Sequence, residues 1–417
     1  MSRTVIHQPA GYVPDEGYEC GLGAMPAYTG TVGGGLTYDP AEHGHDRLTR
    51  RNADTVVPYD KTFDRAIETA RDGERIFIVK DIETNGPILT ADGVHLGSDR
   101  GVPVGVRSKG QGGTHAIGEP GGPGTFSHRS PVVCTDGGAP APSETGASGA
   151  IIKSNGTDTH GLQPEGVSDL LVTGLRWEGD NWPDPSNARV PDDDAGSAGL
   201  YLRDIGAAEC ANNEMYGWRW SGILHYSGNG PLNAHHNHQH GIPRQGFGYG
   251  IAMATDASTT DEARNNYLNL CRHSLKGNEC SYNAVNNIQG PKTANHMFDV
   301  HSPATGDYLF RNNTFLTDRV TDYSPRDQPA INIRDVPGSC TIEANQFEHA
   351  DPGDAIWLEV GNDGNYRWPP ADGFEDVTTV NNNTFGGETK EGVGAQTGGS
   401  DTSPTETGGT DGTSGGQ

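Results

Sequence analysis

The strongest constraint on the fold of this chain is an asparagine that recurs with an apolar residue two positions after it. The pattern occurs at Asn213, Asn266, Asn286, Asn313, Asn345 and Asn383, with Asn237 as a degenerate member. Successive members are 24, 29, 20, 27, 32 and 38 residues apart. A parallel β-helix tolerates such an uneven period, because its strands stack while loops of varying length leave from the corners.

Asparagine has a physical role at such a corner. It accepts a left-handed or bridge backbone conformation, and its amide can hydrogen-bond to the coils above and below. Short strands and polar turns alternate along the same part of the chain. A β-propeller would instead need four-stranded blades of even length with a regular signature, and the sequence has neither. The sequence therefore predicts an all-β protein, a single-stranded right-handed parallel β-helix.

The chain divides into three parts by composition. Residues 1–58 lack periodicity and are expected to form an irregular N-terminal arm, residues 59–388 to form the β-helix, and residues 389–417, rich in Gly, Ser, Thr and Asp, to be a disordered tail. Phe63, Ala66, Ile67 and Ala70 recur at helical spacing just before an apolar strand. A short capping helix is therefore expected at the start of the β-helix.

The charge balance is strongly acidic. The formal net charge is -26, and only seven of the 29 basic residues are lysine. Such a surface repels itself in dilute buffer, and salt relieves the repulsion by shortening the Debye length to roughly 3 Å at 1 M. We interpret the composition as an adaptation to high salt. Nucleic acid is not an expected partner, because no basic stripe exists to displace its counterions.

The N-terminal segment contains no apolar run of the kind found in signal peptides, and no stretch approaches the roughly 20 apolar residues of a membrane span. Membrane insertion is therefore not expected. We expect the protein to act extracellularly or on a virion surface, reached by an unusual export route, after removal of a leader, or as part of a virus particle. Six cysteines could form three disulfides in an oxidising compartment, and none has zinc-type spacing.

Several segments carry a resemblance to a known superfamily. They are GVHLGSDRG at 93–101, VTGLRWEG at 172–179, the histidine-rich stretch at 235–251, CRHSL at 271–275 and HMFDVHS at 296–302. Over residues 59–388 the chain resembles the right-handed parallel β-helix repeat proteins of the pectate-lyase-like superfamily, particularly those of halophilic archaea and their viruses. The superfamily includes polysaccharide lyases, glycoside hydrolases, epimerases and viral tailspikes, so the resemblance implies carbohydrate as the ligand and leaves the reaction open.

A cluster of ionisable residues is the candidate catalytic site. Phe298 and Val300 suit the interior of a strand, so Asp299 and His301 are expected to project outward together. An outward Asp and His can polarise each other as a general base requires. Coils of similar length bring further residues to the same face, and the full candidate set is Arg272, His273, His296, Asp299 and His301. Burial of His273 or pairing of Arg272 with Glu279 or Asp299 is the structural alternative.

A second group of residues is expected to border this site and contact sugar. Aromatic side chains crowd into 177–249, and aromatic faces stack on sugar rings; TrpArgTrp at 218–220 is expected to place both indoles on one strand face. The candidate substrate-binding residues are Trp218, Trp220, Tyr226, His236, His238, Tyr249, Glu279 and Tyr282.

Metal binding has weaker support in the sequence. Histidines at 236, 238 and 240 are expected on one face, where two of them and a third ligand from a neighbouring coil could chelate zinc. The superfamily resemblance does not imply a zinc protein, so no metal site is assigned. The PDDDAG run at 191–196 offers oxygen ligands of the type that Ca²⁺ binds, and no other cofactor is expected.

The sequence leaves two functions open. The first is a β-helix protein that binds and cleaves an extracellular, acidic polysaccharide at high salt, as a lyase or a hydrolase. The second is a non-catalytic fibre or tailspike of a halophilic virus that binds a cell-surface glycan, for which a homotrimer is a common arrangement. The stacked His, Asp and Arg residues favour the first, and the irregular arm favours the second.

Overall fold

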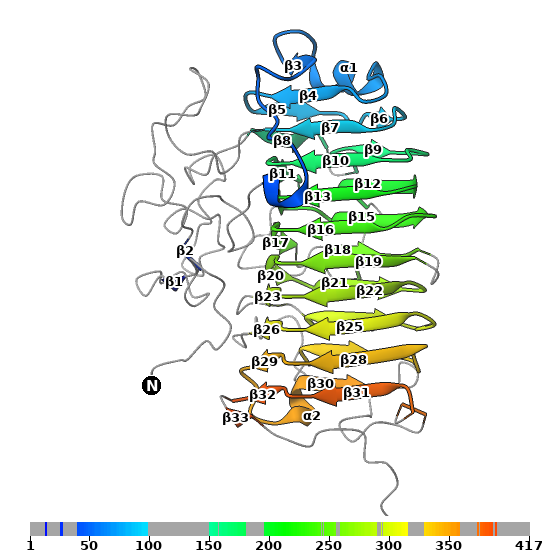
Figure 1. The fold of residues 1–417 in the computed structure, drawn as a ribbon. Coiled ribbons are helices and arrows are strands. Elements are labelled where there is room, and N and C mark those ends of the chain that lie inside the picture. The colour runs from blue at the N-terminus through cyan, green and yellow to red at the C-terminus, as the bar shows by residue number, and fades with distance from the viewer. Residues whose placement is uncertain are drawn as a thin grey trace, which may run out of the picture.

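The structure is a computed structural model. It describes residues 40–98, 150–156, 158–180, 196–242, 244, 246–255, 259–289, 293, 295–315, 329–358, 373–374, 376–386 and 388–389, together with two short strands, β1 (Val13–Pro14) and β2 (Pro26–Ala27). The chain winds into a stack of coils, each contributing strands to parallel sheets (Figure 1). The predicted all-β parallel β-helix is confirmed.

Three long sheets form the walls of the stack, and we number them in the order in which a coil visits them. Sheet I has 11 strands: β3 (Thr55–Val57), β4 (Arg75–Ile78), β7 (Val94–Gly97), β10 (Leu170–Thr173), β13 (Ala208–Ala211), β16 (Leu232–His235), β19 (Thr260–Arg264), β22 (Ser281–Val285), β25 (Asp307–Arg311), β28 (Ser339–Glu343) and β31 (Thr378–Asn381).

Sheet II also has 11 strands: β5 (Ile82–Thr84), β8 (Ile151–Ser154), β11 (Arg176–Glu178), β14 (Glu214–Tyr216), β17 (His238–Ile242), β20 (Tyr267–Cys271), β23 (Ile288–Gln289), β26 (Thr314–Phe315), β29 (Gln346–Phe347), β32 (Thr384–Phe385) and the antiparallel β33 (Glu388–Thr389). Sheet III has seven: β12 (Ala198–Ile205), β15 (Ser221–Gly228), β18 (Tyr249–Met253), β21 (His273–Asn278), β24 (Phe298–His301), β27 (Ile331–Ile333) and β30 (Ile356–Leu358).

Smaller elements complete the described chain. β1 pairs with β2, and β6 (Ile88–Leu89) pairs with β9 (Gln163–Pro164). The short helices are η1 (Pro40–His43), α1 (Phe63–Glu68) and α2 (Pro352–Ala355). Helix α1 buries Phe63, Ala66 and Ile67 beside the first strands of the stack, so the predicted capping helix is confirmed (Figure 1). Strand β3 enters sheet I at Thr55, before the expected start of the β-helix at residue 59. The 390–417 stretch lies outside the described residues.

The core runs along the axis of the stack and is built of side chains in register. Phe315, Phe347 and Phe385 occupy equivalent positions of successive sheet II strands, with ring centroids 4.8 and 4.9 Å apart. These spacings match the separation of hydrogen-bonded strands, so identical rings stack with little offset between coils. Each coil therefore buries its apolar side chains against the next one.

An asparagine ladder follows the corner between sheets I and II. From Asn237 onward, the side-chain oxygen accepts from the backbone N–H and the amide of the asparagine one coil earlier, and in the first rung it accepts from Leu175 N–H. The side-chain amide also donates to a backbone carbonyl. The rungs are Asn213, Asn237, Asn266, Asn287, Asn313, Asn345 and Asn383, all buried. The ladder thus satisfies polar groups that the corner would otherwise bury unpaired.

Two details of the predicted repeat are wrong. The fourth rung is Asn287, where the apolar spacing had indicated Asn286. The left-handed conformation belongs to the residue before each rung, with φ of 56° at Asn212, 55° at His236 and 57° at Asn286. The rung itself is held by its hydrogen bonds. Two adjacent asparagines at 286–287 hide this one-residue offset in the sequence.

Cysteines contribute to the core as thiols. Cys210, Cys280 and Cys340 are free and buried, so the arrangement of six cysteines in three disulfides is wrong for this fold. Burial raises the pKa of the Cys280 thiol to about 12, which keeps it protonated and unreactive. Within the described residues, no helix is long and apolar enough to cross a membrane.

Candidate active site

The outer face of sheet III carries the candidate active site, and strand alternation places its central residue. Phe298 and Val300 of β24 are fully buried in the core, and Asp299 between them projects to the other side. Its neighbours in register are Lys276 of β21 and Asn332 of β27. The predicted orientation of β24 is therefore correct.

Asp299 is a buried carboxylate that several donors surround. Its Oδ2 lies 2.6 Å from His301 Nε2 and 3.4 Å from His273 Nε2. Arg334 donates to both oxygens, with Nε to Oδ1 at 3.0 Å and Nη2 to Oδ2 at 2.8 Å, and Asn332 donates to Oδ1 at 3.2 Å. Burial opposes ionisation, but the neighbouring His273, His301 and Arg334 hold the pKa of Asp299 well below its usual range.

His273 reaches this cluster because the chain bends just before it. Cys271 belongs to the core, and a bend at Arg272 between β20 and β21 interrupts the alternation that would have sent His273 inward. Its ring stacks between those of Tyr249, 5.7 Å away, and His296, 5.3 Å away. Burial lowers the pKa of His273 well below its ordinary value and that of His296 to about 3, so both rings are neutral at neutral pH.

Arg272, Tyr249 and Lys276 form the edge of the cluster. Arg272 Nη1 donates to Gly246 O at 3.0 Å and lies 3.5 Å from the Tyr249 hydroxyl. The alternative pairing of Arg272 with Glu279 or Asp299 is not seen. Lys276 Nζ lies 5.8 Å from the centre of the Tyr249 ring, and burial lowers the pKa of this amine to about 8.

His301 is the group of the cluster best placed for proton transfer. Its side chain is 24% exposed while Asp299 is inaccessible, so a ligand reaches the imidazole first. Burial lowers the pKa of His301 from its ordinary value, and Asp299 opposes this shift. The imidazole is thus neutral at neutral pH with an anionic carboxylate behind it, the arrangement that general-base catalysis uses.

Aromatic side chains continue the same face toward the N-terminal coils. Trp220 lies with its ring centroid 6.0 Å from Tyr201, 6.5 Å from Tyr226 and 5.5 Å from Phe247. Tyr226 is 46% exposed, and Trp220, Tyr201 and Phe247 pack on a buried cluster that includes Tyr249. We call these four rings the aromatic row. It leads directly to the Asp299 cluster through Tyr249.

A cleft opens beyond the C-terminal ends of the sheet III strands. It has a volume of about 610 Å³ and is lined by Asp204, Ser227, Gly228, Asn229, Ala254, Thr255, Glu279, Pro303 and Thr305. Pro303 follows His301 by two residues, so the cleft adjoins the cluster along the chain. Glu279, a candidate substrate-binding residue, is an exposed residue with φ of 56° in this lining.

Two candidate substrate-binding residues are wrong, because both lie in the core. Trp218 is fully buried and donates from its indole to Trp177 O at 3.2 Å. It lies in the bend between β14 and β15, where the backbone turns and Trp218 and Trp220 no longer share a face. Tyr282 is an inward residue of β22 that packs against Tyr308 and Phe310.

His236 and His238 do not border the Asp299 cluster, which corrects another expectation. His236 occupies the left-handed corner between sheets I and II, beside His235 and His43. His238 lies on the outer side of sheet II, with its ring 4.2 Å from that of His240. Histidines at 236, 238 and 240 thus form no single surface, because the corner separates the first from the other two.

The HisGlnHis segment does meet a third ligand-type residue from a neighbouring coil. Glu214 Oε1 lies 3.0 Å from His240 Nε2, and one ligand atom from each of Glu214, His238 and His240 lies within 4.8 Å of the others. Arg176 is also bonded to Glu214, with Nε 2.7 Å from Oε2. This cation already balances the buried carboxylate. The calcium-type run at 191–195 lies outside the described residues.

Two members of the cluster were missed from the sequence, Arg334 and Lys276. The sequence could have placed both, because the core-facing residues of their strands fix which side chains point outward. Ile331 and Ile333 face the core, so Asn332 and Arg334 must face outward beside Asp299 and His301. Likewise, Leu275 and Gly277 face inward and leave Lys276 on the outer face. Aligning the strands on their core positions would have found both.

Comparison with known proteins identifies no relative of this chain. No family model, no curated protein and no solved structure matches it. The fold and the geometry of the described residues therefore carry the functional argument.

Proposed function

We propose that this protein binds an acidic extracellular polysaccharide along the outer face of sheet III and cleaves it beside Asp299 and His301. One observation carries the proposal: the aromatic row and the buried Asp299 cluster lie on the same face and meet at Tyr249. Aromatic rings bind the apolar faces of sugars, and the cluster supplies a base next to cations. We propose membership of the pectate-lyase-like superfamily on the same grounds.

β-Elimination suits the cluster better than hydrolysis. Glycoside hydrolases generally need two carboxyl groups that flank the scissile bond, whereas Asp299 is the single carboxylate among the described residues of the cluster. Elimination needs a cation against the uronate carboxylate and a base for the adjacent C–H. Arg272 fits the first role and His301 the second.

The elimination is balanced by groups of the same cluster. Because Asp299 accepts from His301 Nε2, the other nitrogen, Nδ1, takes the proton from the carbon next to the carboxylate. The electron pair forms a carbon–carbon double bond, and the glycosidic C–O bond at the next carbon breaks. Lys276, whose pKa is about 8, returns a proton to the departing oxygen. Asp299 and Arg334 orient His301 and do not touch the sugar.

Burial of the cluster favours a second candidate, a fibre that binds glycan without cleaving it. Asp299 and His273 have no exposed surface, and Arg334 pairs with Asp299 through two bonds, as a purely structural network would. In this case the aromatic row alone holds the glycan. A homotrimer on a virion surface is the expected assembly, and sedimentation at high salt measures it.

An assay with two readouts separates these functions. The full chain is incubated in molar salt with polygalacturonate, with alginate and with acidic surface polysaccharide from halophilic cells. New unsaturated uronic ends are followed by ultraviolet absorbance and new reducing ends by a colour reaction. Both signals together indicate the proposed elimination. Reducing ends alone indicate hydrolysis, and retention without either signal indicates the binding fibre.

A pair of tyrosine variants tests the aromatic row. Y226A should weaken retention on the polysaccharide by about tenfold, since stacked aromatic contacts contribute on the order of 1 kcal/mol or more. Y59A is the matched control, because Tyr59 is 62% exposed but lies near the capping helix, away from sheet III. Equal retention of both variants would contradict the row as the sugar-binding surface.

A further inference from the structure

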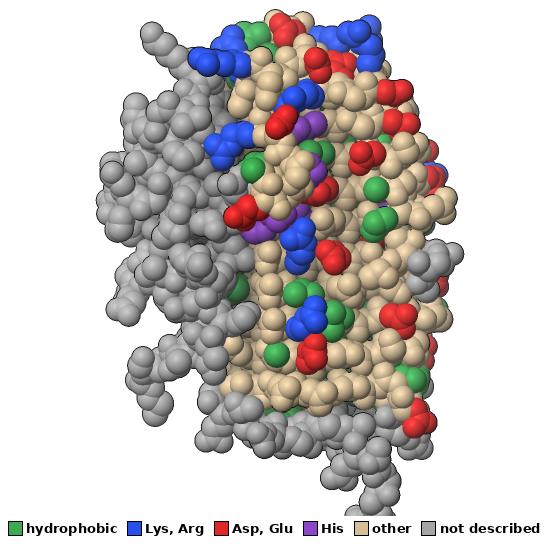
Figure 2. Space-filling view, in the orientation of Figure 1, with side chains coloured by type: hydrophobic (Ala, Val, Ile, Leu, Met, Phe, Trp, Pro, Cys, Tyr) green, Lys and Arg blue, Asp and Glu red, His purple; other side chains and the backbone are tan. Residues whose placement is uncertain are grey.

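A separate group of imidazoles lies on the outer side of sheet I, where residues 40–54 run against the sheet (Figure 1). Leu48 from this segment is buried against Phe77 and Val79. His45 Nε2 lies 2.9 Å from Glu209 Oε1. In Figure 2, histidine side chains gather along one edge of this face, between acidic and basic neighbours. The N-terminal segment thus meets the β-helix at a histidine-rich surface.

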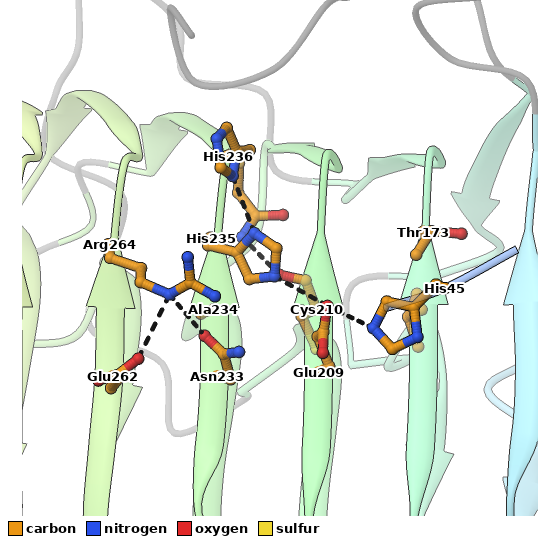
Figure 3. A network of polar contacts seen from close by, with 12 residues as sticks. His45, Thr173, Glu209, Cys210, Asn233, Ala234, His235, His236, Glu262 and Arg264 are labelled. Atoms are coloured by element: carbon orange, nitrogen blue, oxygen red, sulfur yellow. Dashed lines mark hydrogen bonds and ion pairs between the residues drawn. The ribbon is translucent and has the colours of Figure 1, made fainter. Parts of the chain in front are cut away.

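Three histidines from two distant parts of the chain converge there. His43 ends helix η1, His235 ends β16, and His236 is the left-handed corner residue after it. The His43 ring lies 4.5 Å from that of His235 and 5.3 Å from that of His236, and one ring nitrogen from each lies within 4.8 Å of the other two. His235 Nδ1 and His236 Nδ1 are 2.8 Å apart and point at one another (Figure 3).

Glu209 fixes the tautomer of His235. Its Oε1 lies 2.9 Å from His235 Nε2, and a carboxylate only accepts, so His235 carries its proton on Nε2 (Figure 3). His235 Nδ1 is then an acceptor, and His236 Nδ1–H donates to it. A carboxylate behind the far nitrogen of a histidine is the usual outer support of a metal-bound imidazole, because it orients the ring and increases its basicity.

We propose that His43, His235 and His236 bind one divalent transition-metal ion of the zinc type, which fastens residues 40–48 to sheet I. Neutral imidazoles favour such ions over Ca²⁺ or Mg²⁺. The ion takes the place of the proton between the two Nδ1 atoms, that proton moves to His236 Nε2, and the pair opens to the roughly 3.3 Å that tetrahedral bonds of about 2.0 Å require. Glu209 and Glu262 offset the nearby charge of Arg264.

The full chain, stripped of metal by a chelator and returned to molar salt, tests the proposal with Zn²⁺ as the probe. Equilibrium dialysis should give one tight site per chain. H43A should lower the Zn²⁺ affinity at least tenfold, because one of three ligands is lost. E209Q keeps the shape of the side chain and should lower it about 10- to 100-fold, as loss of an outer carboxylate does. Zn²⁺ should also protect residues 40–54 of the wild type from a protease.

Two variants serve as controls, and H240A also tests the neighbouring Glu214 cluster. H95A removes a histidine on the same face that bonds to Thr173 outside the trio, and it should bind Zn²⁺ as the wild type does. H240A should also bind normally. Absence of a tight site in the wild type, normal affinity in both H43A and E209Q, or loss of binding in H240A alone would overturn the proposal. Circular dichroism establishes that each variant is folded before it is compared.

Discussion

At the scale of single residues, burial keeps several histidines of this protein neutral. Removal from water lowers the pKa of His95 and His160 to about 4, of His296 to about 3 and of His236 to about 2. An unfolded histidine has a pKa of about 6.5. Below that value these histidines bind protons in the unfolded chain but stay neutral in the folded chain. The stability that their burial allows is therefore fully present above about pH 6.5 and is lost as the pH falls.

Acid should therefore destabilise the protein, and the buried histidines should determine how steeply the free energy of unfolding depends on pH. Each histidine that is protonated only in the unfolded chain lowers the free energy of unfolding by roughly 1.4 kcal/mol per pH unit as the pH falls. H296Q removes one such group and should flatten the dependence between pH 6 and 4 by about that amount. Urea unfolding at fixed salt measures the slope. Identical slopes for wild type and H296Q would show that His296 is protonated in the folded state.

Asp299 adds to acid sensitivity at lower pH. Its pKa is depressed in the folded protein, so the stability that it contributes is complete above the unfolded value of about 3.9 and is lost as the pH falls through the lower folded value. The outward position of Asp299 and His301 followed from the sequence, because alternation holds inside β24. Arg334 was missed because its placement needs the register of β27 against β24, which appears only when the core positions of the two strands are aligned.

At the scale of elements, the asparagine ladder should contribute more to the free energy of unfolding than the left-handed corner residues beside it. Asn287 accepts from the Asn266 backbone N–H and amide and donates to Ala263 O and Asn313 Oδ1. N287A leaves these buried groups unpaired and should lower the free energy of unfolding by about 2 kcal/mol or more. Denaturant titration at molar salt measures the loss.

The neighbouring asparagine supplies the matched control for this prediction. Asn286 has φ of 57°, a conformation that glycine adopts without strain. N286G should therefore change the free energy of unfolding by a few tenths of a kcal/mol, as replacing a residue in a left-handed position permits. A larger loss for N286G than for N287A would mean that the corner residue holds the coils together.

The same contrast between strands and corners explains how far the elements could be predicted. The capping helix and the strands followed from apolar periodicity, since that pattern records burial directly. Trp218 and His273 both lie next to bends, where a side chain switches faces, and alternation placed Trp218 wrongly and left His273 undecided. Separation of His236 from His238 has the same cause, because the left-handed corner falls between them.

At the scale of the whole molecule, the acidic surface should make stability depend on salt. The net charge of -26 repels itself across a Debye length of about 10 Å at 0.1 M and about 3 Å at 1 M. The melting temperature should therefore rise steeply between these concentrations, in KCl and NaCl alike. A melting temperature that stays flat or falls would remove the argument for a high-salt habitat.

The parallel β-helix as a whole was predictable because one corner signal repeats along it, whereas its chemistry was only partly so. Because the signal repeats in many coils, a local error such as the one-residue offset at Asn286 does not change the predicted fold. The candidate site depends on a few side chains from three or four coils, and a single misplaced residue changes its composition. His301 and Asp299 lie together, Arg272 lies at the edge of the cluster beside Tyr249, and Lys276 and Arg334 are the further members.

Turnover of a uronic polymer by wild type and H301Q is the most direct test of the account. Glutamine keeps a polar, uncharged side chain beside Asp299 but cannot take a proton, so we expect the rate of new unsaturated ends to fall by about 10²- to 10⁴-fold. The melting temperature at molar salt and the retention on the polymer should stay close to those of the wild type. Cleavage by H301Q at the wild-type rate would contradict the proposed acid–base site.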